Sequence, residues 1–253
     1  IFYLKKKNEY LKKQSHIFIT GLPRSGTTSL LNFLFSSNHF ASLTYKSMPF
    51  ILSPNLSKLF SKDKIETKER LHADGVNINS PEALDEVFFN NSDEFIKNEL
   101  INYVQLILIS MNRDVYLSKN NLNYKRIDLI YSILPNSIFL IPIREPLQHA
   151  NSLLNQHLNF SKLQKKDDFI RRYMNYLGHN EFGVNHKSWN NSINHQNPEK
   201  LDYWLEQWCL FYQNLLNKYK FRRNCYFIIY EELVNSNYLK NLLKSLNFDK
   251  FEN

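Results

Sequence analysis

A short apolar run followed by a two-glycine loop most constrains the fold of this chain. The run covers residues 16–20, and its β-prone side chains predict a buried strand that ends at the turn residues Gly21, Leu22 and Pro23. Residues 27–35 then have the pattern of a helix. A strand, a glycine loop and a helix N-terminus in this order present backbone N–H groups and a positive dipole end to an anion.

Apolar runs and helical patterns alternate along the rest of the chain, which predicts an α/β fold with a mostly parallel sheet. Pro142, inside one predicted strand, argues weakly against a central place for it. We expect one domain over residues 1–253, in three α/β/α layers. Strands are predicted at 115–118, 137–143 and 225–230, and helices at 81–89, 94–111, 124–134, 146–157, 201–219 and 238–246.

The composition fits a globular protein with anionic partners. Hydrophobic residues make up 43% of the 253 residues, and the formal charge of +8 favours anionic partners such as nucleotides, nucleic acid, acidic glycans or membrane surfaces without choosing among them. Cys209 and Cys225 cannot build a disulfide framework or a zinc cluster, so we expect a cytoplasmic, reducing environment. Apolar runs fall short of the roughly 18 residues of a membrane helix, so no transmembrane segment is expected.

The loop over residues 21–28 has the glycine spacing of a Walker A motif, but Thr27 stands where that motif requires Lys. The basic residue is Arg24 instead. Its guanidinium can fork onto an oxyanion, while the amides of residues 25–28 and the hydroxyls of Thr27 and Thr28 hold other oxygens. The alternative is a chance turn before a helix.

Residues 23–28, Pro-Arg-Ser-Gly-Thr-Thr, resemble the 5′-phosphosulfate loop of the sulfotransferase superfamily, particularly its tyrosylprotein and bacterial members. The resemblance implies a P-loop fold, the donor 3′-phosphoadenosine-5′-phosphosulfate (PAPS), the product PAP and no metal. It also implies that the loop binds the donor through Pro23, Arg24, Ser25, Gly26, Thr27, Thr28 and Ser29.

A second set of residues matches the family's nucleotide site. Arg144 ends a predicted strand and Ser152 follows eight residues later, which is the family's arrangement for the 3′-phosphate. Tyr230, in Tyr-Glu-Glu-Leu, resembles a tyrosine that reaches the nucleotide. The alternatives are a surface ion pair of Arg144 with Glu145, an ordinary helical serine and a tyrosine in the core.

The resemblance implies that Arg24 and Lys119 are the catalytic cations, and solvated lysine is the alternative for Lys119. The family's general bases do not carry over, because Asn121 replaces a histidine and residues 43–46 contain no glutamate. We expect His72 and Asp74 to substitute, because a loop turn can direct such groups into a cleft. Other possible bases are Glu82, Glu86, His157 and His179.

The predicted function is transfer of a sulfuryl group from PAPS to a hydroxyl or amine. Residues 43–91 and 159–198 lie outside the resemblance and are expected to shape the acceptor site. Family frequency suggests a carbohydrate or glycolipid acceptor, not nucleic acid, although the aromatic residues of these segments could equally form a packed lid. One alternative is a P-loop nucleotide kinase or NTPase, which would require Lys at position 27. The other is a non-catalytic PAP- or glycan-binding module.

Overall fold

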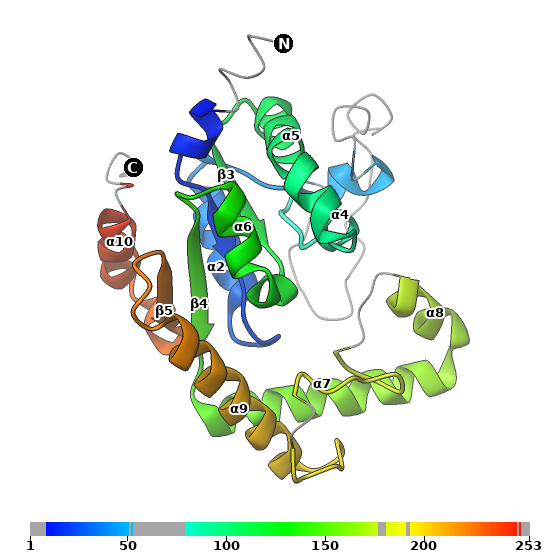
Figure 1. The fold of residues 1–253 in the computed structure, drawn as a ribbon. Coiled ribbons are helices and arrows are strands. Elements are labelled where there is room, and N and C mark those ends of the chain that lie inside the picture. Colours follow the sequence, from blue (N-terminus) through cyan, green and yellow to red (C-terminus); the bar gives the residue numbers. More distant parts are fainter. Residues whose placement is uncertain are drawn as a thin grey trace. The chain divides into compact units, whose positions relative to one another are not determined.

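The computed structural model describes residues 9–50, 52, 79–176, 181–190, 193–246 and 248 (Figure 1). The chain divides into two compact units, and each is built from separated stretches of sequence. The first unit comprises Ile1–Thr20, Thr28–Leu140 and Lys240–Asn253. The second comprises Gly21–Thr27 and Ile141–Leu239. The predicted single domain remains a prediction.

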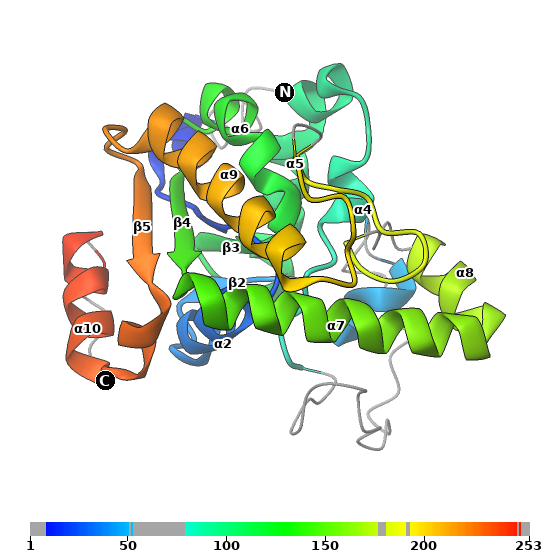
Figure 2. The ribbon, with the colours of Figure 1, turned by 90° about the horizontal axis from the view of Figure 1, so that it is seen from below.

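A five-stranded parallel sheet carries the fold, which confirms the predicted α/β class (Figure 2). The strand order is β2-β3-β1-β4-β5. Within the first unit, Ile17 of β1 is in register with Leu117 of β3 and with Ile138 of β4. The bounds are β1 Ile17–Ile19, β2 Phe40–Ala41, β3 Val115–Lys119, β4 Ile138–Ile143 and β5 Cys225–Ile229.

The first unit packs helix α5 against β2, β3 and α6. Its apolar core centres on the rings of Phe18 and Phe139, which stack with centroids 5.5 Å apart, and of Tyr116, which meets Phe18 edge-on. All three side chains are fully buried. The helical elements of the first unit are α2 Thr27–Ser36, whose first residue is counted in the second unit, η1 Tyr45–Phe50, α4 Glu86–Phe89, α5 Asp93–Met111, η2 Asn121–Lys125 and α6 Ile127–Ile133. Helix α10, Ser236–Ser245, is divided between the two units after Leu239.

The second unit packs the long helix α7 against α8 and α9. Trp204 of α9 is its largest fully buried side chain, and its indole N–H donates to the Pro198 carbonyl at 2.8 Å. The elements are α7 Pro146–Lys166, α8 Asp168–Tyr176, α9 Leu201–Tyr219 and η3 Tyr230–Val234, with strand β5 between α9 and η3. Figure 2 shows α9 and α7 side by side.

The predicted helix over 81–89 is wrong in its first half. Pro81 forms an isolated antiparallel bridge with Thr44, and the helix α4 begins only at Glu86. The Ser-Pro-Glu signal at residues 80–82 is local, whereas the bridge to Thr44 is a tertiary contact that local chemistry does not reveal. Helix α7 extends to Lys166 instead of ending near residue 157.

Pro142 lies in a strand that has neighbours on both sides, because β4 stands between β1 and β5. The Ile138 N–H donates to the His16 carbonyl on the β1 side. Every second residue of a strand directs its backbone N to the same neighbour, so the N atom of Pro142 also faces the β1 side. Strand β1 ends at Ile19, which is in register with Leu140. The missing N–H of Pro142 therefore removes no bond to β1.

Candidate functional site

The loop between β1 and α2 has the backbone of an anion-binding turn. Gly21 and Gly26 have φ angles of 146° and 93°, and Arg24 has φ of 68° in the left-handed region. A non-glycine residue in that region is uncommon and persists where its surroundings hold it. Alternation of left- and right-handed residues turns successive N–H groups into one concavity, as in known phosphate loops.

Ser25 and Thr27, two loop residues that were expected to bind the donor, are both buried. The hydroxyl of Ser25 donates to the Leu22 carbonyl at 2.7 Å, and its amide donates to the same carbonyl at 3.3 Å. Ser25 therefore helps to shape the loop. Thr27 is buried at the start of α2, while the next two residues of that helix, Thr28 and Ser29, are exposed.

Arg24 and Arg144 meet in the second unit, together with Ser152. The Arg24 Nε–H donates to the Ser152 hydroxyl at 3.2 Å, and Arg144 Nη1 donates to the Arg24 carbonyl at 3.3 Å. Ser152 lies two turns into α7, as the spacing predicts, and reaches back to the loop. Two guanidinium groups and one hydroxyl thus lie together beside the glycine loop.

Tyr230 belongs to the same cluster. The guanidinium Cζ of Arg144 lies 4.8 Å from the centre of the Tyr230 ring, a cation–π arrangement. A Cβ on Gly26 would lie 2.2 Å from Tyr230 Cδ2, so the ring packs directly on the loop backbone. Tyr230 starts η3 just after β5 and is half-buried.

The site contains a buried donor that suits an anion. Arg144 Nε has no hydrogen-bond partner within the part of the chain that the structure describes. An unsatisfied buried N–H of a charged group costs free energy, and an oxyanion at this place would satisfy it. The Arg144 guanidinium therefore fits a phosphate or sulfate group.

His149 lies beneath the loop, and sequence reasoning missed it. Its Nε2 is 2.8 Å from the Pro23 carbonyl, which can only accept, so Nε2 carries the proton. Burial, and to a smaller extent the charges of Arg144 and Arg24, lower the pKa of His149 to about 4. A neutral imidazole therefore binds the loop. The sequence did offer one signal, a histidine about one turn into the helix that follows Arg144.

Two glutamates lie near this cluster in the second unit, and neither was predicted to belong to the site. The Glu145 carboxylate caps α7 by accepting from the Leu147 and Gln148 amides at 3.1 and 2.6 Å. The Glu145 amide in turn donates to Glu231 at 2.9 Å, which links the start of α7 to η3. The carboxylate of Glu145 thus satisfies backbone donors at the helix N-terminus.

Lys119 lies in the first unit, at the carboxyl end of β3, in register with Ile19 at the end of β1. A buried carboxylate, Asp85, lies close to this strand end and accepts from the hydroxyls of Tyr103, Tyr116 and Ser118 at 2.7, 2.8 and 2.6 Å. Burial raises the pKa of Asp85, and the three hydroxyl donors oppose that rise. Asp85 was not predicted, because its partners lie 18 to 33 residues away.

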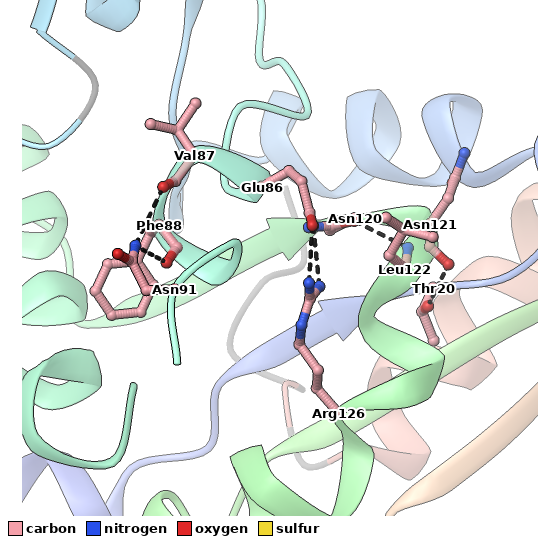
Figure 3. Close-up of polar contacts among 9 residues, drawn as sticks. All are labelled: Thr20, Glu86, Val87, Phe88, Asn91, Asn120, Asn121, Leu122 and Arg126. Carbon is pink, nitrogen blue, oxygen red and sulfur yellow. Dashed lines mark hydrogen bonds and ion pairs between the residues drawn. The ribbon is translucent and has the colours of Figure 1, made fainter. Parts of the chain in front are cut away.

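The predicted bases have different outcomes. His72, Asp74 and His179 lie outside the described residues. Glu86 accepts two bonds from Arg126, at 2.8 and 2.9 Å, and one from Asn120 at 2.7 Å (Figure 3). The other two also have bonded partners: Glu82 accepts from the Tyr45 hydroxyl, and His157 Nδ1 accepts from the Gly183 amide.

Three aromatic residues in the described part of 159–198 pack against α9. Phe182, His186 and Trp189 surround Trp204, with ring centroids 5.8, 5.0 and 5.6 Å from it. Gln207 of α9 accepts from the Trp189 amide at 3.1 Å, which fixes the segment on the helix. This arrangement corresponds to the packed-lid alternative for these rings.

Over the part of the chain that the structure describes, no group of three or more His, Cys, Asp and Glu side chains could hold a metal ion. No helix there is long and apolar enough to cross a membrane. Cys209 is exposed, whereas Cys225 is buried.

Comparisons with known proteins agree with the α/β fold. A family model described as "Sulfotransferase family" matches residues 16–248. The solved structure of sulfotransferase STF9 from Mycobacterium avium matches with a TM-score of 0.53 and 10% identity, covering 97% of this chain and 67% of that one. Sulfotransferase STF1 from Mycobacterium tuberculosis matches with a TM-score of 0.53 and 12% identity, covering 97% and 71%. No curated protein sequence matches significantly.

Proposed function

Because the chain belongs to the sulfotransferase family, we propose that it transfers a sulfuryl group from PAPS to a hydroxyl or amine of an acceptor. The observation that carries this proposal is the cluster of Arg24, Arg144, Ser152 and Tyr230 around the glycine loop. PAPS has two anionic ends, the 5′-phosphosulfate and the 3′-phosphate, and the two arginines of this cluster match that charge distribution.

The donor is held in this proposal by two groups of residues. The loop from Pro23 to Ser29 and the Arg24 guanidinium bind the phosphosulfate, through backbone N–H groups and charge. Arg144 and Ser152 bind the 3′-phosphate, and the unsatisfied Arg144 Nε–H supports this assignment. We assign Tyr230 to contact the nucleotide, and the packing of its ring against Arg144 and Gly26 supports this assignment.

The reaction is an in-line displacement at sulfur. The acceptor oxygen or nitrogen forms a bond to sulfur while the bond from sulfur to the bridging oxygen of the 5′-phosphate breaks, and PAP leaves. Negative charge grows on that bridging oxygen, so a cation beside it stabilises the transition state. We assign this role to Lys119 and Arg24. The acceptor proton passes to a base, for which His72 and Asp74 remain our candidates.

The acceptor is proposed to be a carbohydrate or glycolipid, on the sequence resemblance alone, and the compartment to be reducing and cytoplasmic, because the chain has only two cysteines. The test is a transfer assay with radiolabelled PAPS against a panel of glycans, glycolipids and small alcohols. We expect label to move to at least one acceptor and PAP to form in equal amount. PAP binding without transfer would indicate a non-catalytic module, and stabilisation by ATP with Mg²⁺ but not by PAP would indicate a nucleotide kinase.

A further inference from the structure

Two adjacent carboxylates bind every second residue at the end of β3. Asp85 accepts from the hydroxyls of Tyr116 and Ser118, and Glu86 accepts from the side-chain amide of Asn120 at 2.7 Å. Asn120 continues the extended backbone, with φ of −146° and ψ of 118°. Residues two apart in a strand lie on the same face, so positions 116, 118 and 120 face the carboxylates together.

Lys119 therefore leaves the strand on the opposite side, between two neighbours whose side chains are both fixed. The Ser118 hydroxyl is 2.6 Å from Asp85 Oδ2, in a fully buried environment. Asn120, also buried, is held through its amide nitrogen by Glu86, while its amide oxygen accepts from the Leu122 N–H at 2.9 Å. Fixing the residues on both sides limits how the backbone of Lys119 can rotate.

Glu86 is itself rigidly held. Arg126 donates to both of its carboxylate oxygens, and the two side chains are only 20% and 17% exposed. The Arg126 guanidinium also lies 5.4 Å from the ring centre of Phe89, in the same short helix as Glu86. Figure 3 shows the two bonds between Arg126 and Glu86, and a bidentate pair of this kind fixes the orientation of both side chains. Glu86 thus serves as a fixed acceptor for Asn120.

The turn that follows Lys119 is also bonded to the end of β1. The Asn120 N–H donates to the Ile19 carbonyl at 3.0 Å, and the Thr20 hydroxyl donates to the Asn121 carbonyl at 3.2 Å (Figure 3). Thr20 directly precedes the first glycine of the loop in sequence. The turn after Lys119 is consequently bonded to α4 on one side and to β1 on the other.

From this arrangement we propose that Asp85 and Glu86 are positioning residues that orient Lys119 for sulfuryl transfer, Asp85 through Ser118 and Glu86 through Asn120. The inference rests on the proposed function, because it presumes the role of Lys119. It reassigns Glu86, a candidate base, to an indirect role in which its oxygens accept from Arg126 and Asn120.

The test compares variants that remove similar bonds at different distances from Lys119. Glu86→Gln weakens the hold on Asn120, and Ser118→Ala removes the contact beside Lys119. Tyr103→Phe is the matched control, because it removes another hydroxyl donor to Asp85 from α5. We expect the first two variants to lower kcat about tenfold with unchanged PAP affinity, since small misplacements of a reacting group reduce rate strongly. Tyr103→Phe should lower the melting temperature and leave kcat within about twofold.

A double-mutant cycle separates positioning from general damage. In a Lys119→Ala background, Glu86→Gln should cause no further loss of kcat, because the group that it positions is gone. An equal loss in both backgrounds, or an unchanged kcat in the single variants, would overturn the inference. If the wild-type chain transfers no sulfuryl group from PAPS, the proposed function fails instead.

The positioning itself has a readout that needs no transfer. The labelling rate of Lys119 by an amine-reactive reagent, followed by mass spectrometry, should change at least about threefold in Glu86→Gln and in Ser118→Ala, because its orientation and surroundings change. The Tyr103→Phe chain should label at the wild-type rate. Equal labelling rates in all four proteins would overturn the inference whatever the fate of the proposed function.

Discussion

His149 Nε2 lies 2.8 Å from the carbonyl oxygen of Pro23, so helix α7 holds the loop that contains Arg24 through a neutral imidazole. The helix also supplies Ser152, which accepts from Arg24. One helix thus supports the loop from below and contacts its charged residue. The pKa of His149, lowered to about 4 by burial, keeps the imidazole neutral near pH 7.

This arrangement predicts an acid-sensitive fold. The pKa of His149 is lower in the folded chain than its unfolded value of about 6.5, so its contribution to stability is present above pH 6.5 and is lost as the pH falls towards 4. Each such histidine contributes a slope of up to about 1.4 kcal/mol per pH unit in that window. In urea unfolding, His149→Asn should show a shallower loss of stability between pH 6.5 and 4 than the wild-type chain.

His16 supplies an internal comparison, because burial also lowers its pKa to about 4. Its Nδ1 accepts from the Tyr116 amide at 3.1 Å, away from the glycine loop. His16→Asn should flatten the same pH profile. If neither variant changes the slope, the two imidazoles are not held neutral as described.

Gly26→Ala should weaken PAP binding and lower the melting temperature. The new Cβ would collide with the Tyr230 ring, 2.2 and 2.6 Å from two of its atoms, and φ of 93° disfavours any side chain. Alanine at positive φ costs about 1 kcal/mol or more. Adding Tyr230→Ala should relieve the collision but not the backbone strain, so stability should recover in part. Full wild-type stability of the single variant would contradict the packing.

Lys119→Ala should reduce turnover about 10² to 10³-fold, the usual loss for one group that stabilises growing negative charge. PAP affinity should change far less, because ground-state binding is assigned to the loop, Arg24 and Arg144. The matched control is Lys125→Ala, an exposed lysine at the end of η2. Turnover at the wild-type level in Lys119→Ala would refute its role.

Transfer activity should survive EDTA. The proposed mechanism supplies its positive charges from Arg24, Arg144 and Lys119. Abolition of activity by EDTA with recovery on adding Mg²⁺ would favour a nucleotide kinase. The measurement is initial rate with labelled PAPS before and after dialysis against the chelator.

Local sequence signals predicted the elements that position the donor site. The apolar run before Gly21 is β1, the strand before Arg144 is β4, and the helix over 201–219 matches α9. Each has a strong period or a clear terminator. The short strand β2 and the helix α8 were not predicted, and the two-residue length of β2 gives too little pattern to detect.

The tertiary relationships could not be predicted. Nothing local indicates that Asp85 receives three hydroxyls from two distant elements, or that His149 holds Pro23. Such contacts depend on which buried polar groups the packed fold brings together. A buried polar group needs a hydrogen-bond partner, because burial without one costs free energy. The sequence indicated the type of chemistry at Arg144 and Lys119, whereas their supporting residues required the structure.

We assign Arg144 to the recognition of the 3′-phosphate of the donor. Calorimetry with PAP and with AMP, which lacks that phosphate, tests it directly in the wild-type chain, in Arg144→Ala and in the exposed control Arg223→Ala. The wild-type and control chains should prefer PAP by at least about tenfold, since a charge-assisted contact contributes about 1.5 to 3 kcal/mol. Arg144→Ala should bind PAP and AMP almost equally. An unchanged preference for PAP in Arg144→Ala would contradict the assignment of Arg144 to the 3′-phosphate.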